Sequence, residues 1–223
     1  MTSKISQAEL FLKTLHESGV EEIYIAQPKK RKNSSNQSTA KDTILRLRDE
    51  VVVCTKCYEL VQNRHSVVFG SGNPQAKLVF VGEAPGAEED RQGLPFVGRA
   101  GQLLTKMIES INLKREEVFI ANVLKCRPPG NRPPKPDEIQ NCEPYLVKQL
   151  SLIQPKLICA LGTFAAQTLL KTTTPISSLR GKIYDYNGIS VICTFHPAYL
   201  LRNPAEKRKA WEDLKKLRDL LKQ

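Results

Sequence analysis

Four short apolar runs separated by helical patterns constrain the fold of this chain more than any other feature. The runs, rich in β-branched residues, are KLVFVG (77–82), EVFIANV (117–123), KLICALG (156–162) and ISVICTF (189–195). Such uninterrupted apolarity is typical of strands buried on both faces. Helical patterns lie at 99–111, 136–150, 163–171 and 204–222. The alternation predicts an α/β fold, a three-layer αβα sandwich around a mainly parallel sheet of about four strands. The segment RGKIYDYNG, before the fourth run, leaves room for an antiparallel excursion.

The first 42 residues differ in character from the rest of the chain. Residues 6–17 carry the spacing of a short amphipathic helix, and QPKKRKNSSNQSTAKD (27–42) has the polarity of a linker. We interpret KKRK as part of a solvated linker, although a nuclear signal or a nucleic-acid contact would have the same composition. The division expected is therefore an N-terminal appendage with a polar linker over 1–42 and one domain over 43–223.

The charge of the chain indicates a polyanionic partner. The net charge is +11 and the pI about 9.4. The first 41 residues hold 7 basic and 4 acidic residues, so +8 remains on 42–223 and the domain itself is basic. Nucleic acid is the favoured partner over a membrane, because no apolar run approaches the roughly 20 residues that a spanning helix needs. The N-terminus lacks the apolar core of a signal peptide, which predicts a cytoplasmic protein in a reducing, intracellular compartment.

The six cysteines fall into two groups. Cys54 and Cys57 form a C-x₂-C pair before the first strand, and Cys126 and Cys142 enclose fifteen residues rich in proline. In a reducing compartment, four thiolates of this kind could hold zinc or a [4Fe–4S] cluster. The other two cysteines lie inside apolar runs and are predicted to be buried thiols: Cys159 and Cys193.

Polar residues follow three of the four predicted strands directly. Glu83 comes after the first strand, Asn122 ends the second, and His196 follows the fourth. Ligands of an open parallel sheet bind outside the carboxyl ends of its strands, so these three side chains should converge on one pocket.

The chemistry shared by these residues is recognition of a planar heterocycle. An asparagine amide offers a donor and an acceptor together, which matches O4 and N3–H of uracil and mismatches cytosine. Phe96, in the loop GLPFVGRAG, could supply a stacking face. Unstacked bases are recognised in this way, by stacking and by hydrogen bonds to the Watson–Crick edge.

Several motifs together closely resemble the family 4 uracil-DNA glycosylases, the iron–sulfur branch of the uracil-DNA glycosylase superfamily. They are GEAPGAEEDRQGLPFVGRAGQLL (82–104), NVLKCRPPGNRPP (122–134), Cys142 and HPAYLLR (196–202). The resemblance covers roughly residues 45–220. It implies that the chain hydrolyses the N-glycosidic bond of deoxyuridine in DNA, releases uracil and leaves an abasic site, as a monomer acting on single- or double-stranded DNA.

The resemblance also implies roles for individual residues. Gly82, Glu83 and Ala84 match the segment that lines the uracil site, and Phe96 matches the stacking aromatic. Asn122 matches the amide that recognises the base edge, and His196 matches the histidine that contacts uracil O2. Many members of the wider superfamily place an aspartate at the position of Ala84 to activate water, which leaves Glu83 as the nearest group to position the water here.

Two further expectations follow from the same motifs. Leu200 is predicted to be the wedge that enters the DNA stack, with Arg202 behind it; alternatively, the leucines of this turn pack under the sheet. The resemblance selects a structural [4Fe–4S] cluster on Cys54, Cys57, Cys126 and Cys142, which would hold Lys125, Arg127 and Arg132 toward DNA. Two other functions remain open, a relative that binds or traps uracil-DNA without turnover and an iron–sulfur redox protein.

Overall fold

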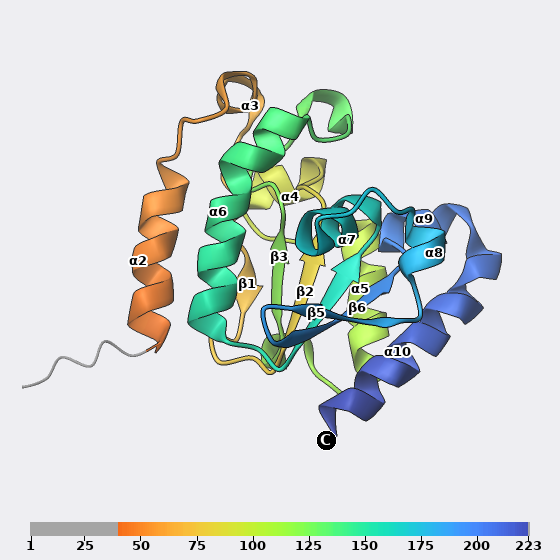
Figure 1. Cartoon of the computed structure of the whole chain (residues 1–223). Coiled ribbons are helices and arrows are strands. Elements are labelled where there is room, and N and C mark those ends of the chain that lie inside the picture. Colours follow the sequence, from red (N-terminus) through yellow and green to blue (C-terminus); the bar gives the residue numbers. More distant parts are fainter. Residues whose placement is uncertain (1–39, 223) are drawn as a thin grey trace, which may run out of the picture. The chain divides into compact units, whose positions relative to one another are not determined.

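A computed structural model describes residues 40–222 of the chain. The predicted N-terminal helix at 6–17 and most of the predicted linker lie outside the described residues. Helix α2 (Ala40–Val52) includes residues 40–42, so the end of that linker is helical (Figure 1).

The described residues build one six-stranded mixed sheet in the order β1-β3-β2-β4-β6-β5 (Figure 1). Its strands are β1 (Ser71–Gly72), β2 (Leu78–Gly82), β3 (Phe119–Asn122), β4 (Leu157–Leu161), β5 (Ile183–Tyr186) and β6 (Ile189–Thr194). The four inner strands β3, β2, β4 and β6 run parallel and coincide with the four predicted runs. Every residue of β2, β3 and β4 is buried, as continuous apolarity predicts.

The prediction of about four strands is corrected by two antiparallel edge strands. Strand β5 pairs with β6 and is the antiparallel excursion that its sequence suggested. Strand β1 pairs with β3 over two residues only, Ser71 and Gly72, which is too short to give a periodic pattern. Gly72 is needed there, because a Cβ atom would lie 1.9 Å from the carbonyl oxygen of Val118.

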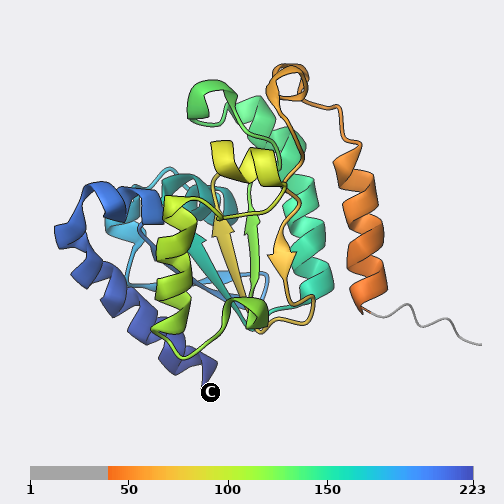
Figure 2. The ribbon, with the colours of Figure 1, turned by 180° about the vertical axis from the view of Figure 1, so that it is seen from behind.

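Helices cover both faces of the sheet, which confirms the three-layer αβα sandwich (Figures 1 and 2). Besides α2, the helices are α3 (Tyr58–Asn63), α4 (Ala87–Gln92), α5 (Arg99–Glu109), α6 (Pro136–Ile153), α7 (Thr163–Leu170), α8 (Ile176–Leu179), α9 (Pro197–Arg202) and α10 (Lys207–Leu221), with single 3₁₀ turns η1 (Arg115–Glu117), η2 (Pro129–Asn131) and η3 (Pro204–Glu206). One core packs against α2, α6 and α7, and the other against α5, α9 and α10. No helix of residues 40–222 is long and apolar enough to cross a membrane.

The segments that leave β2 and β3 are bonded to each other. The backbone N–H of Val123 donates to the carbonyl of Gly82 at 2.9 Å, and that of Leu124 donates to the carbonyl of Glu83 at 3.0 Å. Glu83 and Asn122 are therefore held at one end of the sheet by main-chain contacts that no side-chain substitution removes.

Candidate active site

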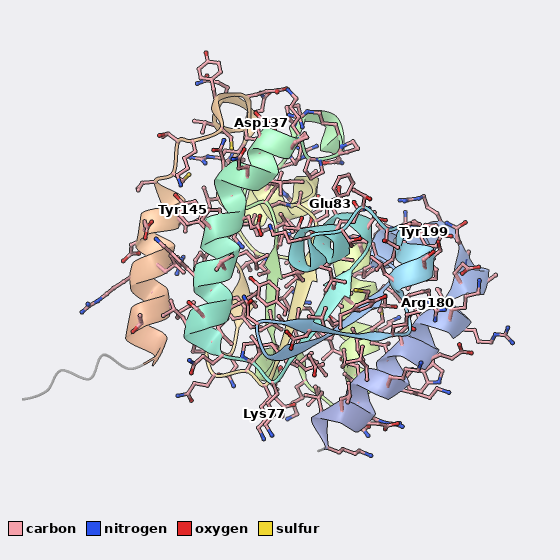
Figure 3. The ribbon with its side chains drawn as sticks, in the orientation of Figure 1. Lys77, Glu83, Asp137, Tyr145, Arg180 and Tyr199 are labelled. Atoms are coloured by element: carbon pink, nitrogen blue, oxygen red, sulfur yellow. The ribbon has the colours of Figure 1, made fainter. Side chains whose placement is uncertain are left out.

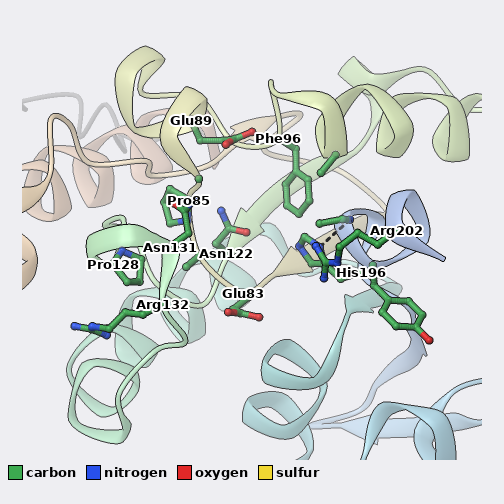
Figure 4. A pocket seen from close by; sticks show the side chains of 15 residues that line it. Glu83, Pro85, Glu89, Phe96, Asn122, Pro128, Asn131, Arg132, His196 and Arg202 are labelled. Atoms are coloured by element: carbon green, nitrogen blue, oxygen red, sulfur yellow. Dashed lines mark hydrogen bonds between the residues drawn. The ribbon is translucent and has the colours of Figure 1, made fainter.

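A cavity of about 390 Å³ lies at the carboxyl ends of the parallel strands (Figure 4). Six of the predicted site residues line it: Glu83, Ala84, Phe96, Asn122, His196 and Arg202. They come from segments more than a hundred positions apart in sequence, and the parallel topology brings them together. The prediction of one convergent pocket agrees with the structure.

Asn122 presents a buried polar atom that the protein itself leaves unbonded. The residue ends β3 and is 2% exposed, and its Oδ1 has no hydrogen-bond partner in the described part of the chain. Only one other buried side-chain atom of residues 43–222 shares this state, Nε of Arg132, whose terminal nitrogens bind Glu138 and Glu59. An asparagine that served only to cap the turn would bond through Oδ1, so the amide is free to meet a ligand.

Phe96 stands beside Asn122 because Gly82 has no side chain. A Cβ atom at Gly82 would lie 2.4 Å from Oδ1 of Asn122 and 2.6 Å from Cζ of Phe96. The Phe96 ring centroid is 5.5 Å from that of His196, with an interplanar angle of 33° (Figure 4). Phe96 is 6% exposed, so its ring both packs in the core and forms a wall of the cavity.

The loop that carries Phe96 adopts an unusual backbone conformation and is held from two sides. Phe96 has φ of 52°, in the left-handed region that a bulky side chain seldom adopts. Oε1 of Glu89 accepts from the N–H groups of Val97 and Gly98 at 2.8 and 2.9 Å. Nη2 of Arg115 donates to the carbonyl of Pro95 at 2.6 Å. No sequence pattern indicated a role for Glu89 or Arg115, because their contacts depend on a tight turn that periodicity does not reveal.

His196 is held as a neutral imidazole with its proton on Nε2. The residue caps α9, and its Nδ1 accepts from the backbone N–H of Ala198 at 3.1 Å (Figure 4). Burial, with a contribution from the Arg202 charge, lowers the pKa of His196 to about 4. An imidazole that accepts through Nδ1 carries its hydrogen on Nε2. His196 is therefore a donor to the cavity without carrying a charge.

The four cysteines assigned to a cofactor line one cavity under α3 and α6. Cys54 and Cys57 are half-buried, while Cys126 and Cys142 are buried. Their sulfurs meet N–H groups: Nη1 of Arg64 lies 3.1 Å from Sγ of Cys126, and the backbone nitrogen of Lys125 lies 3.2 Å from Sγ of Cys142.

The four thiols fit the donor set of an iron–sulfur cluster. Such a cluster is bound by thiolates spread around it, with hydrogen bonds to the sulfurs. The four thiols line one cavity, and N–H groups contact two of their sulfurs. In residues 43–222, no group of three or more His, Cys, Asp or Glu side chains is arranged to hold a single metal ion.

Comparison with known proteins identifies the family. Residues 69–215 match the model of the uracil DNA glycosylase superfamily. The type-4 uracil-DNA glycosylase of Archaeoglobus fulgidus is 46% identical over 77% of this chain and 89% of that protein. Those of Sulfurisphaera tokodaii and Thermotoga maritima are each 45% identical, over 80% and 78% of this chain and 85% and 92% of the relatives. This chain belongs to the type-4 uracil-DNA glycosylase family.

Within this type-4 glycosylase, Glu83 is the acidic side chain closest in sequence to the position of the missing aspartate. Ala84 lines the cavity with a methyl group, so it offers no group for activating water. Glu83 also lines the cavity, and burial raises its pKa above the ordinary value. The carboxylate is thus partly desolvated, and a group in that state gains more from a bound water or donor than an exposed carboxylate does.

The glycosylase does not present Leu200 as a wedge. Leu200 is 1% exposed and packs in the core between the sheet, α5 and α10, as the alternative interpretation of this turn expected. Its neighbours on α9 take the exposed positions: Tyr199 is 36% exposed and lines the cavity together with Arg202 (Figure 3). A helix places consecutive residues about 100° apart, so Leu200 and Tyr199 cannot share a face.

Of the three basic residues expected to face DNA, Lys125 is buried and the other two are bonded to other side chains. Lys125 is 1% exposed, which makes that prediction wrong for it. Arg132 lines the cavity but bonds Glu138 at 2.6 Å and Glu59 at 3.1 Å. Arg127 bonds Oδ1 of Asn131 at 2.8 Å on the surface. The buried state of Cys159 and Cys193 is confirmed, since both are 0% exposed.

Proposed function

We propose that this protein is a uracil-DNA glycosylase that hydrolyses the N-glycosidic bond of deoxyuridine in DNA. The observation that carries the proposal is the unbonded Oδ1 of Asn122, buried at the base of the cavity. Leaving a buried acceptor unbonded costs about 1–3 kcal/mol, so such an atom is best explained by a ligand that donates to it. Uracil N3–H is such a donor, and the amide nitrogen of the same side chain can donate to O4.

The same cavity would stabilise the charge that develops on the leaving base. As the glycosidic bond lengthens, the sugar gains positive charge and uracil leaves as an anion with much of its charge on O2. The Nε2–H of His196 is a neutral donor for that oxygen, and the backbone N–H groups of residues 83, 84 and 86 would add to it. Donors that act on developing charge in a desolvated site typically contribute about 3 kcal/mol each to lowering the barrier. Phe96 would stack on the base.

Glu83 would position the water that attacks C1′. Its carboxylate lines the cavity, and its partial desolvation favours contact with the positive sugar and a polarised water. The target base must leave the duplex to enter a cavity of this kind, and Tyr199 and Arg202, at its rim, are placed to contact the strand around the extruded nucleotide.

We also propose that Cys54, Cys57, Cys126 and Cys142 hold one [4Fe–4S] cluster. Support comes from the shared cavity and from the N–H donors on two of the sulfurs. When bound, the cluster would supply a covalent tie between the segment before α3, the loop after β3 and α6. All six cysteines carry free thiols, which agrees with a reducing intracellular location, and we propose that the enzyme acts as a monomer.

A single-uracil oligonucleotide tests the activity. After incubation with the protein, hot alkali should cleave the strand at the uracil position, and free uracil should be released in equal amount. A stable protein–DNA adduct would indicate a trapping relative instead. Intact DNA with no adduct would contradict the proposal and favour an iron–sulfur redox role.

Metal analysis tests the cofactor separately. Anaerobically purified protein should contain about four irons per chain, and Cys159→Ala or Cys193→Ala should retain that content, because both residues lie in the apolar sheet. A colourless preparation with zinc in place of iron would contradict the assignment.

A further inference from the structure

Lys125 is a cation buried without an anionic partner among the described residues. Its side chain is among the largest fully buried ones of residues 43–222, and in that part of the chain no carboxylate lies within 4.0 Å of its ammonium. Nζ donates instead to two neutral oxygens, the backbone carbonyl of Asn122 at 2.7 Å and Oε1 of Gln149 at 2.6 Å. Gln149 is itself fixed, because its Nε2 donates to the carbonyl of Phe69 at 2.8 Å.

Burying an ammonium group with neutral partners alone is costly, and buried charges are normally paired. Lys125 itself lines the cysteine cavity. Its backbone nitrogen contacts Sγ of Cys142, and the next residue in the chain is Cys126. Four thiolates around an iron–sulfur cluster carry net negative charge, which would balance the lysine.

The ammonium end of the Lys125 side chain bonds Asn122, the residue proposed to recognise the base. The Asn122 carbonyl belongs to the same residue as the unbonded amide, at the point where β3 ends and regular sheet bonding stops. An ammonium bonded to that carbonyl fixes the backbone from which the amide projects. Lys125 thus lines the cysteine cavity and bonds the backbone of Asn122, which lines the base pocket.

We propose that Lys125 is a positioning residue that couples the cysteine-held cluster to the base pocket. Its charge is balanced by the cluster, and its hydrogen bond sets the place of Asn122. The inference rests on the proposed function and on the proposed cluster. It assigns Lys125 no role in DNA binding.

The test compares Lys125→Met with wild type in the iron-loaded full chain. Methionine has a similar length but removes the charge and both hydrogen bonds. Single-turnover excision should fall about tenfold, the effect of one lost hydrogen bond at a positioned group. The affinity for uracil-containing DNA should stay as in wild type, and a chelator should remove iron faster. Lys148→Met is the matched control. It removes an exposed lysine that lies on the same helix as Gln149 and pairs with Glu50. It should change neither the excision rate, nor the DNA affinity, nor the rate of iron loss.

Lys125→Gln separates the two roles and serves if the methionine variant does not fold. Glutamine removes the charge but keeps an N–H donor, so iron loss should remain fast while excision recovers in part. Unchanged iron loss in both variants, or excision and DNA affinity that fall together, would overturn the proposal. Wild type is measured alongside, so that failure of the proposed function can be told from failure of the inference about Lys125. If wild type lacks iron or releases no uracil, the proposed function is wrong, whatever the Lys125 variants show.

Discussion

Two buried polar regions at the same end of the sheet differ in how completely their atoms are bonded. Asp213 of α10, 1% exposed, accepts from Oγ1 of Thr194 at 2.7 Å and from Nε and Nη2 of Arg180 at 3.1 and 2.8 Å. Asn122, 2% exposed, leaves Oδ1 without a partner in the described part of the chain. The first region is complete within the protein, whereas the second is complete only with a ligand. Burial alone therefore does not identify a site, but burial with an unbonded atom does.

The largest effect is expected at Asn122. Asn122→Asp keeps the shape but places a second acceptor and a charge opposite uracil O4, so excision should fall at least about a hundredfold if roughly 3 kcal/mol is lost from the transition state. Single-turnover rates on a uracil oligonucleotide measure it. Asn73→Asp is the control, because Oδ1 of Asn73 already accepts from the N–H of Gln75 in a turn and aspartate can do the same. Near-normal excision by Asn122→Asp would mean that Asn122 only caps the turn and does not recognise the base.

Substitution of His196 should lower the excision rate somewhat less than substitution of Asn122, and it should leave DNA affinity nearly unchanged. His196→Ala removes a donor that acts on charge present only in the transition state, so excision should fall about a hundredfold while DNA affinity changes little. Rates and binding titrations on one oligonucleotide measure both quantities. His65→Ala, which truncates an exposed histidine, is the control. Equal losses of rate and affinity would instead make His196 a residue that positions the base in the ground state.

The bonded region should respond in stability rather than activity. Asp213→Asn replaces one acceptor oxygen by a donor that faces Arg180 or Thr194, so the melting temperature should fall by about 5 °C. Excision per folded molecule should remain close to wild type. Asp219→Asn, at an exposed site on the same helix, should leave the melting temperature unchanged. A large loss of excision in Asp213→Asn without loss of stability would contradict this difference, because both buried regions would then act in excision.

The smallest expected effect is on the pH dependence. Burial lowers the pKa of His196 from its ordinary 6.5 to about 4, so this imidazole is neutral above about pH 4 and should give no break near pH 6.5. Burial raises the pKa of Glu83 above its ordinary 4.5. Excision should therefore be lost as the pH falls through that raised value, because the protonated form cannot hold the water as an anion does. Glu83→Gln should remove this acid limb, and a limb near pH 6.5 that persists in Glu83→Gln would contradict the assignment of His196.

Sequence patterns predicted the inner sheet and most of the pocket. Buried parallel strands are apolar throughout, so β2, β3, β4 and β6 were visible as runs, and polar residues at their ends were visible as breaks in those runs. The motif resemblance supplied the identity of the bound base. Strand β1 escaped notice because its two residues have no periodicity, and α4 because its six residues lie inside a glycine-rich motif.

The errors share one physical cause. Leu200, predicted to be exposed, is buried, and Lys125, predicted to face DNA, is buried as well. Both predictions used the usual preference of a residue type, or the role of a motif, to decide which way a side chain points. That direction depends on which neighbours fill the space around each Cα, and those neighbours come from α5, α10 and α6, which are separate elements of the fold.

The sequence by itself determined the four inner strands, the basic charge of the domain, the grouping of four cysteines outside the strands and the three polar residues at the strand ends. These are local properties, set by composition and period. Only the tertiary structure decided that Asn122 keeps an unbonded oxygen, that His196 is neutral with its proton on Nε2, and that Lys125 joins the base pocket to the cysteine cavity. Each of these depends on hydrogen-bond partners and burial, which exist only after distant segments have packed together.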